Sequence, residues 1–207
     1  MQPTRRMGTP GSASWNAILD SSEEILKEEG YGALTSRRIA EHMGIKQRLI
    51  YYYFKTMDDL IVHTFRRLAE RDLERLSKAL SSPRPLHELW HFCIHTADAR
   101  LILEFMALAN RIEELRAEVV VFIEESRRIQ IAALQEAMAR GASGRAFSPA
   151  AVALFASSLG LLLIREAELG VTMGHIEVAA VVGQFLALAE PMPIGRTPGK
   201  RKVRKSR

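Results

Sequence analysis

The sequence has very little cysteine: Cys93 is the single one among 207 residues. One thiol cannot form an intrachain disulfide, and it cannot build a zinc site from several thiolates. The sequence also lacks a phosphate-binding glycine loop and an activated-nucleophile motif. These absences argue against a disulfide-stabilised protein and against an enzyme, which would have to use the few histidines or the surroundings of Cys93.

Long apolar runs are also missing. The longest charge-free apolar run, Pro149 to Ile164, is shorter than the roughly 18 to 20 residues of a membrane span. Arg5 and Arg6 make the N-terminus basic, but no apolar signal segment follows them. Hydrophobic residues make up 47% of the chain, which is enough to fill a core. We therefore expect a soluble, cytoplasmic protein without a membrane partner.

Acidic residues are absent from the C-terminal segment 195–207, which carries seven basic ones. These are Arg196, Lys200, Arg201, Lys202, Arg204, Lys205 and Arg207. Without these seven residues and without Arg5 and Arg6, the rest of the chain has 20 basic and 24 acidic residues. The isoelectric point near 9.6 is therefore weak support for nucleic-acid binding, and local residues must carry that inference.

Apolar residues recur at helical spacing along the chain, and no stretch alternates as a half-buried strand does. This predicts an all-α fold of about nine helices, with a small three-helix head and a larger helical body. The helices are expected near 14–29, 35–43, 46–52, 57 or 58 to 80, 86–98, 101–110, 111–140, 149–169 and 175–190. The predicted domains are a flexible arm (1–11), the head (12–57), the body (58–194) and a disordered basic tail (195–207).

Two short helices joined around Gly44 form the pattern of a helix-turn-helix. Gly44 can adopt the positive φ of a tight turn. Apolar residues at Ile39, Ile45, Ile50 and Phe54 can fix the angle between the two helices. The second helix can then present its opposite face to DNA.

The segment from Gly32 to Leu60 resembles the N-terminal segment of TetR family regulators. In that family a threonine opens the second helix and Ile-Ala follows; after a Gly-Val turn comes a Leu-Tyr-X-X-Phe run, closed by an acidic residue and leucine. The positions are filled here by Thr35, Ile39, Ala40, Gly44, Ile45, Ile50, Tyr51, Phe54, Asp59 and Leu60. The close match covers about 50 of the 207 residues, and the body matches in outline. The resemblance implies that the head (12–57) is a helix-turn-helix DNA-binding domain and that the body (58–194) binds a ligand and dimerises.

The resemblance implies a DNA-binding role for each matched position. Phosphate contacts are implied for Thr35 and Lys55, and Arg37 and Arg38 are candidates for further phosphate contacts. Gln47 and Arg48 would contact base edges. Tyr51 and Tyr52 would contact the DNA backbone or thymine methyl groups. Lys46 completes the candidate DNA-binding set. The sequence departs from the family at Lys46, Arg48, Leu49 and Met57, where small, hydroxyl-bearing or lysine residues are usual. The operator sequence therefore cannot be transferred from relatives.

The segment 150–164 is apolar around its whole circumference, and the last predicted helix has a similar bias. A helix that is apolar all round must be covered on both sides. We expect these two helices to form a homodimer interface, as the resemblance also implies, although two central core helices are the alternative. The candidate interface residues are Leu154, Leu161, Leu162, Val181 and Phe185.

The other body helices could enclose a pocket for a small-molecule effector. Its candidate lining is Trp90, Phe105, Met106, Asn110, Phe122 and Phe155. Three histidines, His87, His91 and His95, follow at four-residue steps and could chelate a metal in adjacent pairs, but a solvated polar face is the simpler interpretation. We expect no metal and no cofactor.

The sequence therefore predicts a ligand-responsive transcription regulator. The most common behaviour in the resembling family is repression by a dimer on a near-palindromic operator and release by a small molecule; activation stays open. A sequence-independent nucleic-acid binder that relies on the tail is the second hypothesis, and deletion of 195–207 would separate the two.

Overall fold

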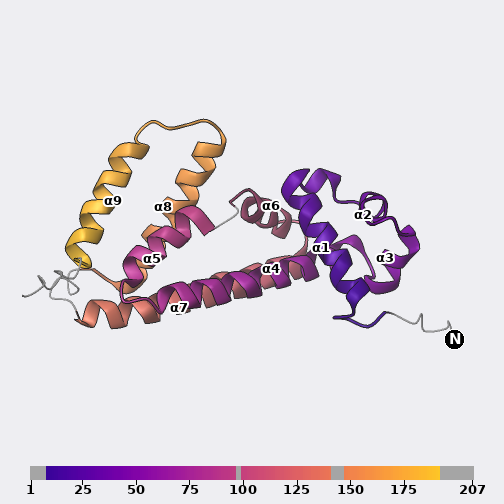
Figure 1. Cartoon of the computed structure of the whole chain (residues 1–207), viewed down its shortest axis with the longest axis horizontal. Coiled ribbons are helices and arrows are strands. Elements are labelled where there is room, and N and C mark those ends of the chain that lie inside the picture. The colour runs from indigo at the N-terminus through magenta and orange to yellow at the C-terminus, as the bar shows by residue number, and fades with distance from the viewer. Residues whose placement is uncertain (1–7, 97–98, 141–146, 192–207) are drawn as a thin grey trace, which may run out of the picture.

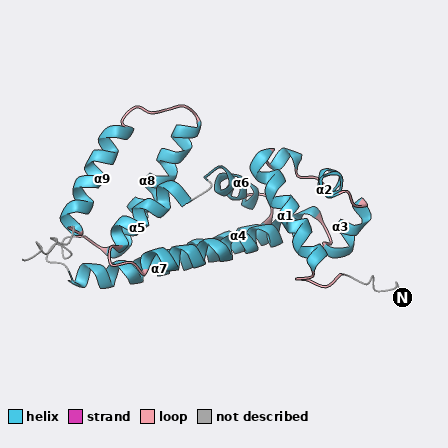
Figure 2. Ribbon diagram, in the orientation of Figure 1, coloured by secondary structure: helices cyan, strands magenta, loops and turns pink. Residues whose placement is uncertain are grey.

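The computed structural model describes residues 8–96, 99–140 and 147–191. Within these ranges the regular structure is helical and contains no strand, which confirms the all-α fold (Figure 2). The elements are α1 (Ala13–Glu28), η1 (Tyr31–Ala33), α2 (Ser36–Met43), α3 (Gln47–Tyr53), α4 (Met57–Leu80), α5 (Pro85–His91), η2 (Phe92–Thr96), α6 (Ala99–Ala109), α7 (Glu113–Arg140), α8 (Pro149–Glu168) and α9 (His175–Ala189). The basic tail 195–207 and most of the expected N-terminal arm lie outside the described residues.

The molecule is elongated, with α1, α2 and α3 gathered at one end and α5, α8 and α9 at the other (Figure 1). The long helices α4 and α7 run side by side between the two ends and pack closely on each other. Helix α4 begins at the head because Thr56 accepts the backbone N–H of Asp59, while Asp59 accepts the backbone N–H of Lys55. These bonds satisfy backbone donors at the helix start, as a capping box does.

Two clusters of buried side chains hold the fold together. The first contains buried residues of α1 to α4, such as Ile18 and Phe54, together with Phe105 of α6 and Leu115 of α7. The second lies at the far end, where α5 packs on α4 and α7, α8 packs on α5 and α7, and α9 packs on α5. Helix α4 contributes buried residues to both clusters, so it joins the core of the head to the core of the body.

Helix α8 passes very close to η2, a short π-helical segment. A Cβ added to Gly160 would lie 2.7 Å from Cβ of Cys93 and 2.9 Å from its carbonyl oxygen, so only glycine permits this approach. Burial raises the pKa of the Cys93 thiol to about 11, although a hydrogen bond with Ser157 acts in the opposite direction. Cys93 is therefore a packing residue and not a reactive thiol at neutral pH.

Helices α8 and α9 carry the largest exposed apolar side chains of the body. In the single chain, Phe155 is 75% exposed and Val181 64% exposed. Helix α8 also has the length and apolar composition of a membrane span, although the sequence predicted that its charge-free run is too short. Since α8 packs on α5, η2, α6 and α7, its apolar composition also suits a core helix that a second chain covers.

Candidate nucleic-acid interface

Helix α3 lies at the outer edge of the head, held by the turn that follows α2. Gly44 has a φ of 65°, in the left-handed region that favours glycine, and it ends α2. Directly after it, the backbone N–H of Ile45 donates to the carbonyl of Ala40 at 3.0 Å. Ile50 and Phe54 are fully buried against α1 and α4, so they fix the inner face of α3. The sequence-predicted helix-turn-helix is present.

A buried serine ties α3 to α2. The Gln47 side-chain amide donates to Oγ of Ser36 at 2.7 Å, and the Tyr51 hydroxyl lies 3.0 Å from the same oxygen. Both side chains therefore turn back toward α2 in the DNA-free chain, although Gln47 was expected at base edges. Ser36 was missed by the sequence reasoning, because a serine one residue after a cap has no distinctive pattern.

The exposed cations on and beside α3 are Lys46, Arg48 and Lys55. Within the described part of the chain, none of their side chains forms an ion pair or hydrogen bond. Lys46 is the N-cap residue of α3 but its side chain does not cap the helix. These three cations can therefore meet phosphates or base edges without first losing a partner.

The arginines of α2 are in a different situation. Arg37 Nε donates to Glu41 at 2.8 Å, and Arg38 forms a forked pair with Glu29, with its Nε 3.0 Å from both carboxylate oxygens. Thr35, the predicted helix-opening residue, caps α2 by accepting the backbone N–H of Arg38 at 3.1 Å. Arg37 and Arg38 are thus paired in the free chain, and each would have to exchange a carboxylate for a phosphate.

The start of α4 is less favourable to phosphate than the sequence suggested. Its first turn carries Asp58 and Asp59, which already compensate the positive end of the helix dipole. Lys55 lies just before the Thr56 cap, so any phosphate contact there depends on its own ammonium group.

Tyr52 and Tyr53, at the C-terminal end of α3, differ in how far they are exposed. Tyr52 is 39% exposed, whereas Tyr53 is half-buried and packs against the core of the head. The Gly8 backbone N–H donates to the Tyr52 carbonyl at 2.9 Å, and Gly8 lies directly against the Tyr53 ring. Tyr52 is therefore the tyrosine that can reach DNA, and Tyr53 is structural.

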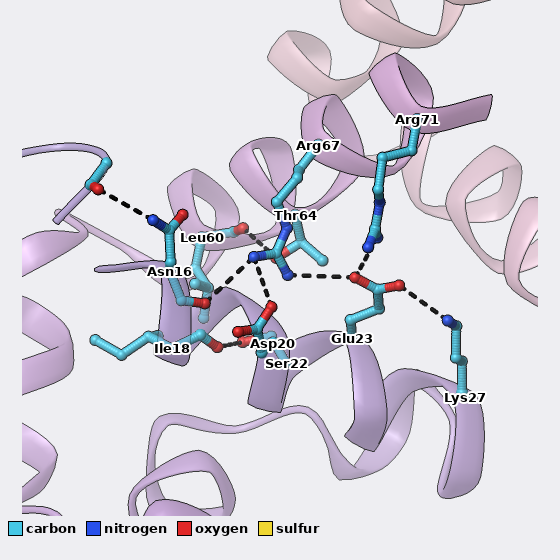
Figure 3. Close-up of polar contacts among 11 residues, drawn as sticks. Asn16, Ile18, Asp20, Ser22, Glu23, Lys27, Leu60, Thr64, Arg67 and Arg71 are labelled. Atoms are coloured by element: carbon cyan, nitrogen blue, oxygen red, sulfur yellow. Dashed lines mark hydrogen bonds and ion pairs between the residues drawn. The ribbon is translucent and has the colours of Figure 1, made fainter. Parts of the chain in front are cut away.

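Charged residues join α1 to α4 on the inner side of the head (Figure 3). Glu23, with a side chain only 9% exposed, accepts Lys27 at 2.9 Å and Arg67 at 3.2 Å, and it also pairs with Arg71. Burial alone would raise the pKa of Glu23, but the hydrogen bonds and charges of Lys27 and Arg71 outweigh burial and lower it. The sequence reasoning missed this cluster, although a glutamate next to the buried stripe of α1 is a signal that could have revealed it.

A second link joins head and body at η1. The backbone N–H of Tyr31 donates to Oε2 of Glu104 on α6 at 2.6 Å. Together with the Glu23 cluster, this bond connects the head to α4 and α6, the two body helices nearest to it.

The candidate pocket residues separate into two cavities. Phe105, Met106 and Phe122 line a cavity of about 110 Å³ bounded by α1, α4, α6 and α7. Trp90 and Phe155 line a more open, almost wholly apolar cavity of about 280 Å³ bounded by α5, α8 and α9. Asn110 is exposed and lines neither of these two cavities.

The predicted dimer residues lie on α8 and α9 as expected. Leu154, Leu162 and Val181 are 43%, 48% and 64% exposed in the single chain. Leu161 and Phe185 are half-buried, and Phe185 also lines the cavity between α5, α8 and α9. Three of the five predicted interface residues are therefore exposed in the single chain, and two are half-buried.

The three histidines differ in their surroundings: His87 is bonded to other side chains, whereas the rings of His91 and His95 lie 4.6 Å apart. His87-Glu-Leu-Trp-His91 has the HExxH spacing of zinc proteases, which the sequence reasoning overlooked. However, Nδ1 of His87 bonds Glu190 at 2.9 Å and its Nε2 contacts Arg84, so both ring nitrogens are occupied. No group of three His, Cys, Asp or Glu residues that could hold a metal occurs in the described ranges.

Comparison with known proteins gives a match at the same segment. The family model of bacterial regulatory proteins of the tetR family matches residues 18–64. The HTH-type transcriptional regulator HbdR of Aromatoleum sp. (strain CIB) is 27% identical over 113 residues, which are 52% of this chain and 48% of HbdR. The chain spans about half the length of the curated relatives it matches.

Solved structures show that the fold continues beyond this segment. A TetR transcription regulator from Haloarcula marismortui ATCC 43049 superposes with a TM-score of 0.67 at 20% identity, over 83% of this chain and 95% of that chain. FadR from Bacillus subtilis in complex with stearoyl-CoA superposes with a TM-score of 0.58 at 19% identity, over 86% of this chain and 100% of that chain. Residues 18–64 therefore match the family model of tetR-type bacterial regulatory proteins, and the chain shares the all-α fold of these solved regulators.

Proposed function

We propose that this chain is a cytoplasmic repressor that binds a near-palindromic operator as a homodimer and leaves it when a small molecule binds. The observation that carries the proposal is the pair of unpaired exposed cations Lys46, at the N-cap of α3, and Arg48, in its first turn. The opposite side of α3 is anchored in the core by Ile50 and, at the C-cap, by Phe54. An arginine on a recognition helix can bind guanine through two hydrogen bonds, which gives base specificity. Lys55 supplies attraction to phosphate that does not depend on sequence.

The homodimer is supported by the exposed apolar side chains of α8 and α9. Phe155 and Leu162 on α8 and Val181 on α9 would be costly to leave in water. A twofold pairing of these helices buries them and places two copies of α3 at half-sites about one helical turn apart. This spacing is the reason to expect a near-palindromic operator.

Response to a small molecule is supported by the position of α4. This helix lines the cavity of about 110 Å³ and also contributes to the core of the head. One relative of the same fold binds stearoyl-CoA, and we infer that this chain also has an effector. A ligand that favours one packing of α4 shifts the population of DNA-binding conformations.

The base-reading role is tested by comparing two single substitutions on α3 and beside it. Arg48→Ala is expected to weaken binding to a selected operator by about 1 to 3 kcal/mol and to relax the preference at one base position, whereas Lys55→Ala weakens binding to all sequences alike. Fluorescence anisotropy with operator and random duplexes measures both effects.

Arg128→Ala is the matched control, because Arg128 is an exposed arginine in the middle of α7. It should leave operator affinity unchanged. Equal losses from Arg48→Ala on operator and on random DNA would contradict the assignment of base reading to α3.

A further inference from the structure

The cavity bounded by α1, α4, α6 and α7, which we name the junction cavity, has an apolar interior and a charged rim. Its volume is about 110 Å³. Apolar walls come from Phe65, Leu68, Leu101, Phe105, Val119 and Phe122, with Met106 half exposed beside them. An apolar cavity of about 150 Å³ can hold benzene, so this one accepts an aliphatic group of about four to six carbons.

The rim of the junction cavity has more positive than negative charge. Lys27, Arg71 and Arg75 face Glu23 and Asp72 there. Arg75 pairs with Asp72 at 3.3 Å, and Lys27 with Glu23 at 2.9 Å. Arg71 is the third cation of the rim, and it pairs with Glu23, which also pairs with Lys27 and Arg67.

Arg71 is the cation that Glu23 can most easily spare. Glu23 retains Lys27 and the more deeply buried Arg67 if Arg71 leaves, and Arg67 also holds Asp20 at 2.8 Å. Among the described residues, Arg71 makes one hydrogen bond, to Glu23, and its buried Nε has no partner (Figure 3). The guanidinium therefore has donors left for a further acceptor at the mouth of the cavity.

We propose that the junction cavity binds a compact aliphatic monocarboxylate, whose chain fills the apolar interior and whose carboxylate pairs with Arg71. This inference rests on the proposed function and names the chemical class of the effector. The rim favours an anion because its three cations outnumber its two carboxylates, and a neutral amide would forgo the forked pair of guanidinium and carboxylate.

The same contact would couple binding to the head. Glu23 lies on α1 and Arg71 on α4, so each ligand carboxylate that draws Arg71 away from Glu23 removes one bond between the head and α4. The ligand thereby favours conformations in which the two helices are less firmly joined. DNA affinity falls because the spacing of the two recognition helices is no longer fixed.

The binding step is tested on the full chain with [methyl-¹³C]methionine. Met106 lines the junction cavity, whereas Met173 lies 93% exposed in the loop between α8 and α9. Titration with sodium pentanoate is expected to shift the Met106 methyl resonance and to leave Met173 in place, with at least tenfold higher affinity than pentanamide. Pentylamine should cause no shift. Equal affinity for acid, amide and amine, or an unmoved Met106 signal, overturns the inference.

Variants then assign the carboxylate contact. Arg71→Gln should lower pentanoate affinity at least tenfold, Arg71→Lys should lower it less, and Arg128→Gln on the exposed middle of α7 should not change it. Wild-type affinity in folded Arg71→Gln overturns the Arg71 contact. If Arg71→Gln does not fold, the affinities of the wild-type chain for pentanoate, pentanamide and pentylamine still test whether the junction cavity prefers a carboxylate.

Operator binding by anisotropy separates this inference from the proposed function. Loss of operator affinity at saturating pentanoate supports both. Pentanoate binding without an effect on DNA overturns the coupling, while the cavity assignment stands. Operator binding by a chain that ignores pentanoate overturns the cavity assignment and leaves DNA recognition intact.

Discussion

Val181→Glu is expected to convert the dimer into a monomer and to weaken operator binding by about 10²- to 10⁴-fold, because the second half-site contact is then no longer intramolecular. Val181 is 64% exposed in the single chain, so the substitution should leave the fold of each chain unchanged. In the dimer, however, twofold symmetry places two glutamates in an apolar interface where neither has a partner. Sedimentation velocity and operator anisotropy measure the two effects.

Val121→Glu on α7 is the matched control, since Val121 is 63% exposed and lies outside α8 and α9. It should leave both mass and affinity unchanged. A wild-type chain that sediments as a monomer at micromolar concentration, or a dimeric Val181→Glu variant, would show that α8 and α9 are not the interface.

Glu23→Gln is expected to lower the free energy of unfolding by about 3 kcal/mol at pH 7, because Arg67 and Arg71 lose the buried carboxylate that they share. Glutamine has the same shape, so the loss measures charge and not packing. Urea unfolding followed by circular dichroism gives the difference. Glu41→Gln, which breaks the exposed pair with Arg37, should leave the free energy of unfolding nearly unchanged.

The pH dependence of this difference has a definite sign. The pKa of Glu23 in the folded chain is below its ordinary value of 4.5, so the carboxylate stabilises the fold at every pH above that value. The stabilisation is lost as the pH falls below 4.5 through the folded pKa. The difference between wild type and Glu23→Gln should therefore be constant near neutrality and shrink in acid; a constant difference down to pH 2 would contradict the paired carboxylate.

Local signals in the sequence were sufficient for the head. The cap at Thr35, the left-handed turn at Gly44 and the start of α4 after Thr56 all depend on side chains within four residues of the backbone that they organise. The helix predicted to begin near Met57 or Asp58 and to end near Leu80 is α4, Met57–Leu80. Short-range chemistry therefore predicts where the recognition helix lies.

Contacts between distant segments could not be predicted in the same way. Ser36 holds Gln47 and Tyr51 only because α2 and α3 meet at that angle, and Glu23 meets Arg67 and Arg71 only when α1 packs on α4. Nothing local marks the break between α5 and η2 either, since Phe92–Thr96 contains neither glycine nor proline.

The pocket residues illustrate the same limit. Phe105 and Trp90 both belong to apolar stripes of the body, but the packing of the helices places them in different cavities. A stripe identifies which face of a helix is buried. It does not identify which neighbouring helix covers that face. The residues expected to line one pocket therefore line two separate cavities.

The central claim is that two copies of α3 read one DNA site, and selection of bound duplexes from a random pool tests it most directly. We predict an enriched near-palindrome with two half-sites about one helical turn apart, and a change at one position in each half-site when the selection is repeated with Arg48→Ala. Enrichment of no sequence, or of a single half-site with no symmetric partner, would contradict it.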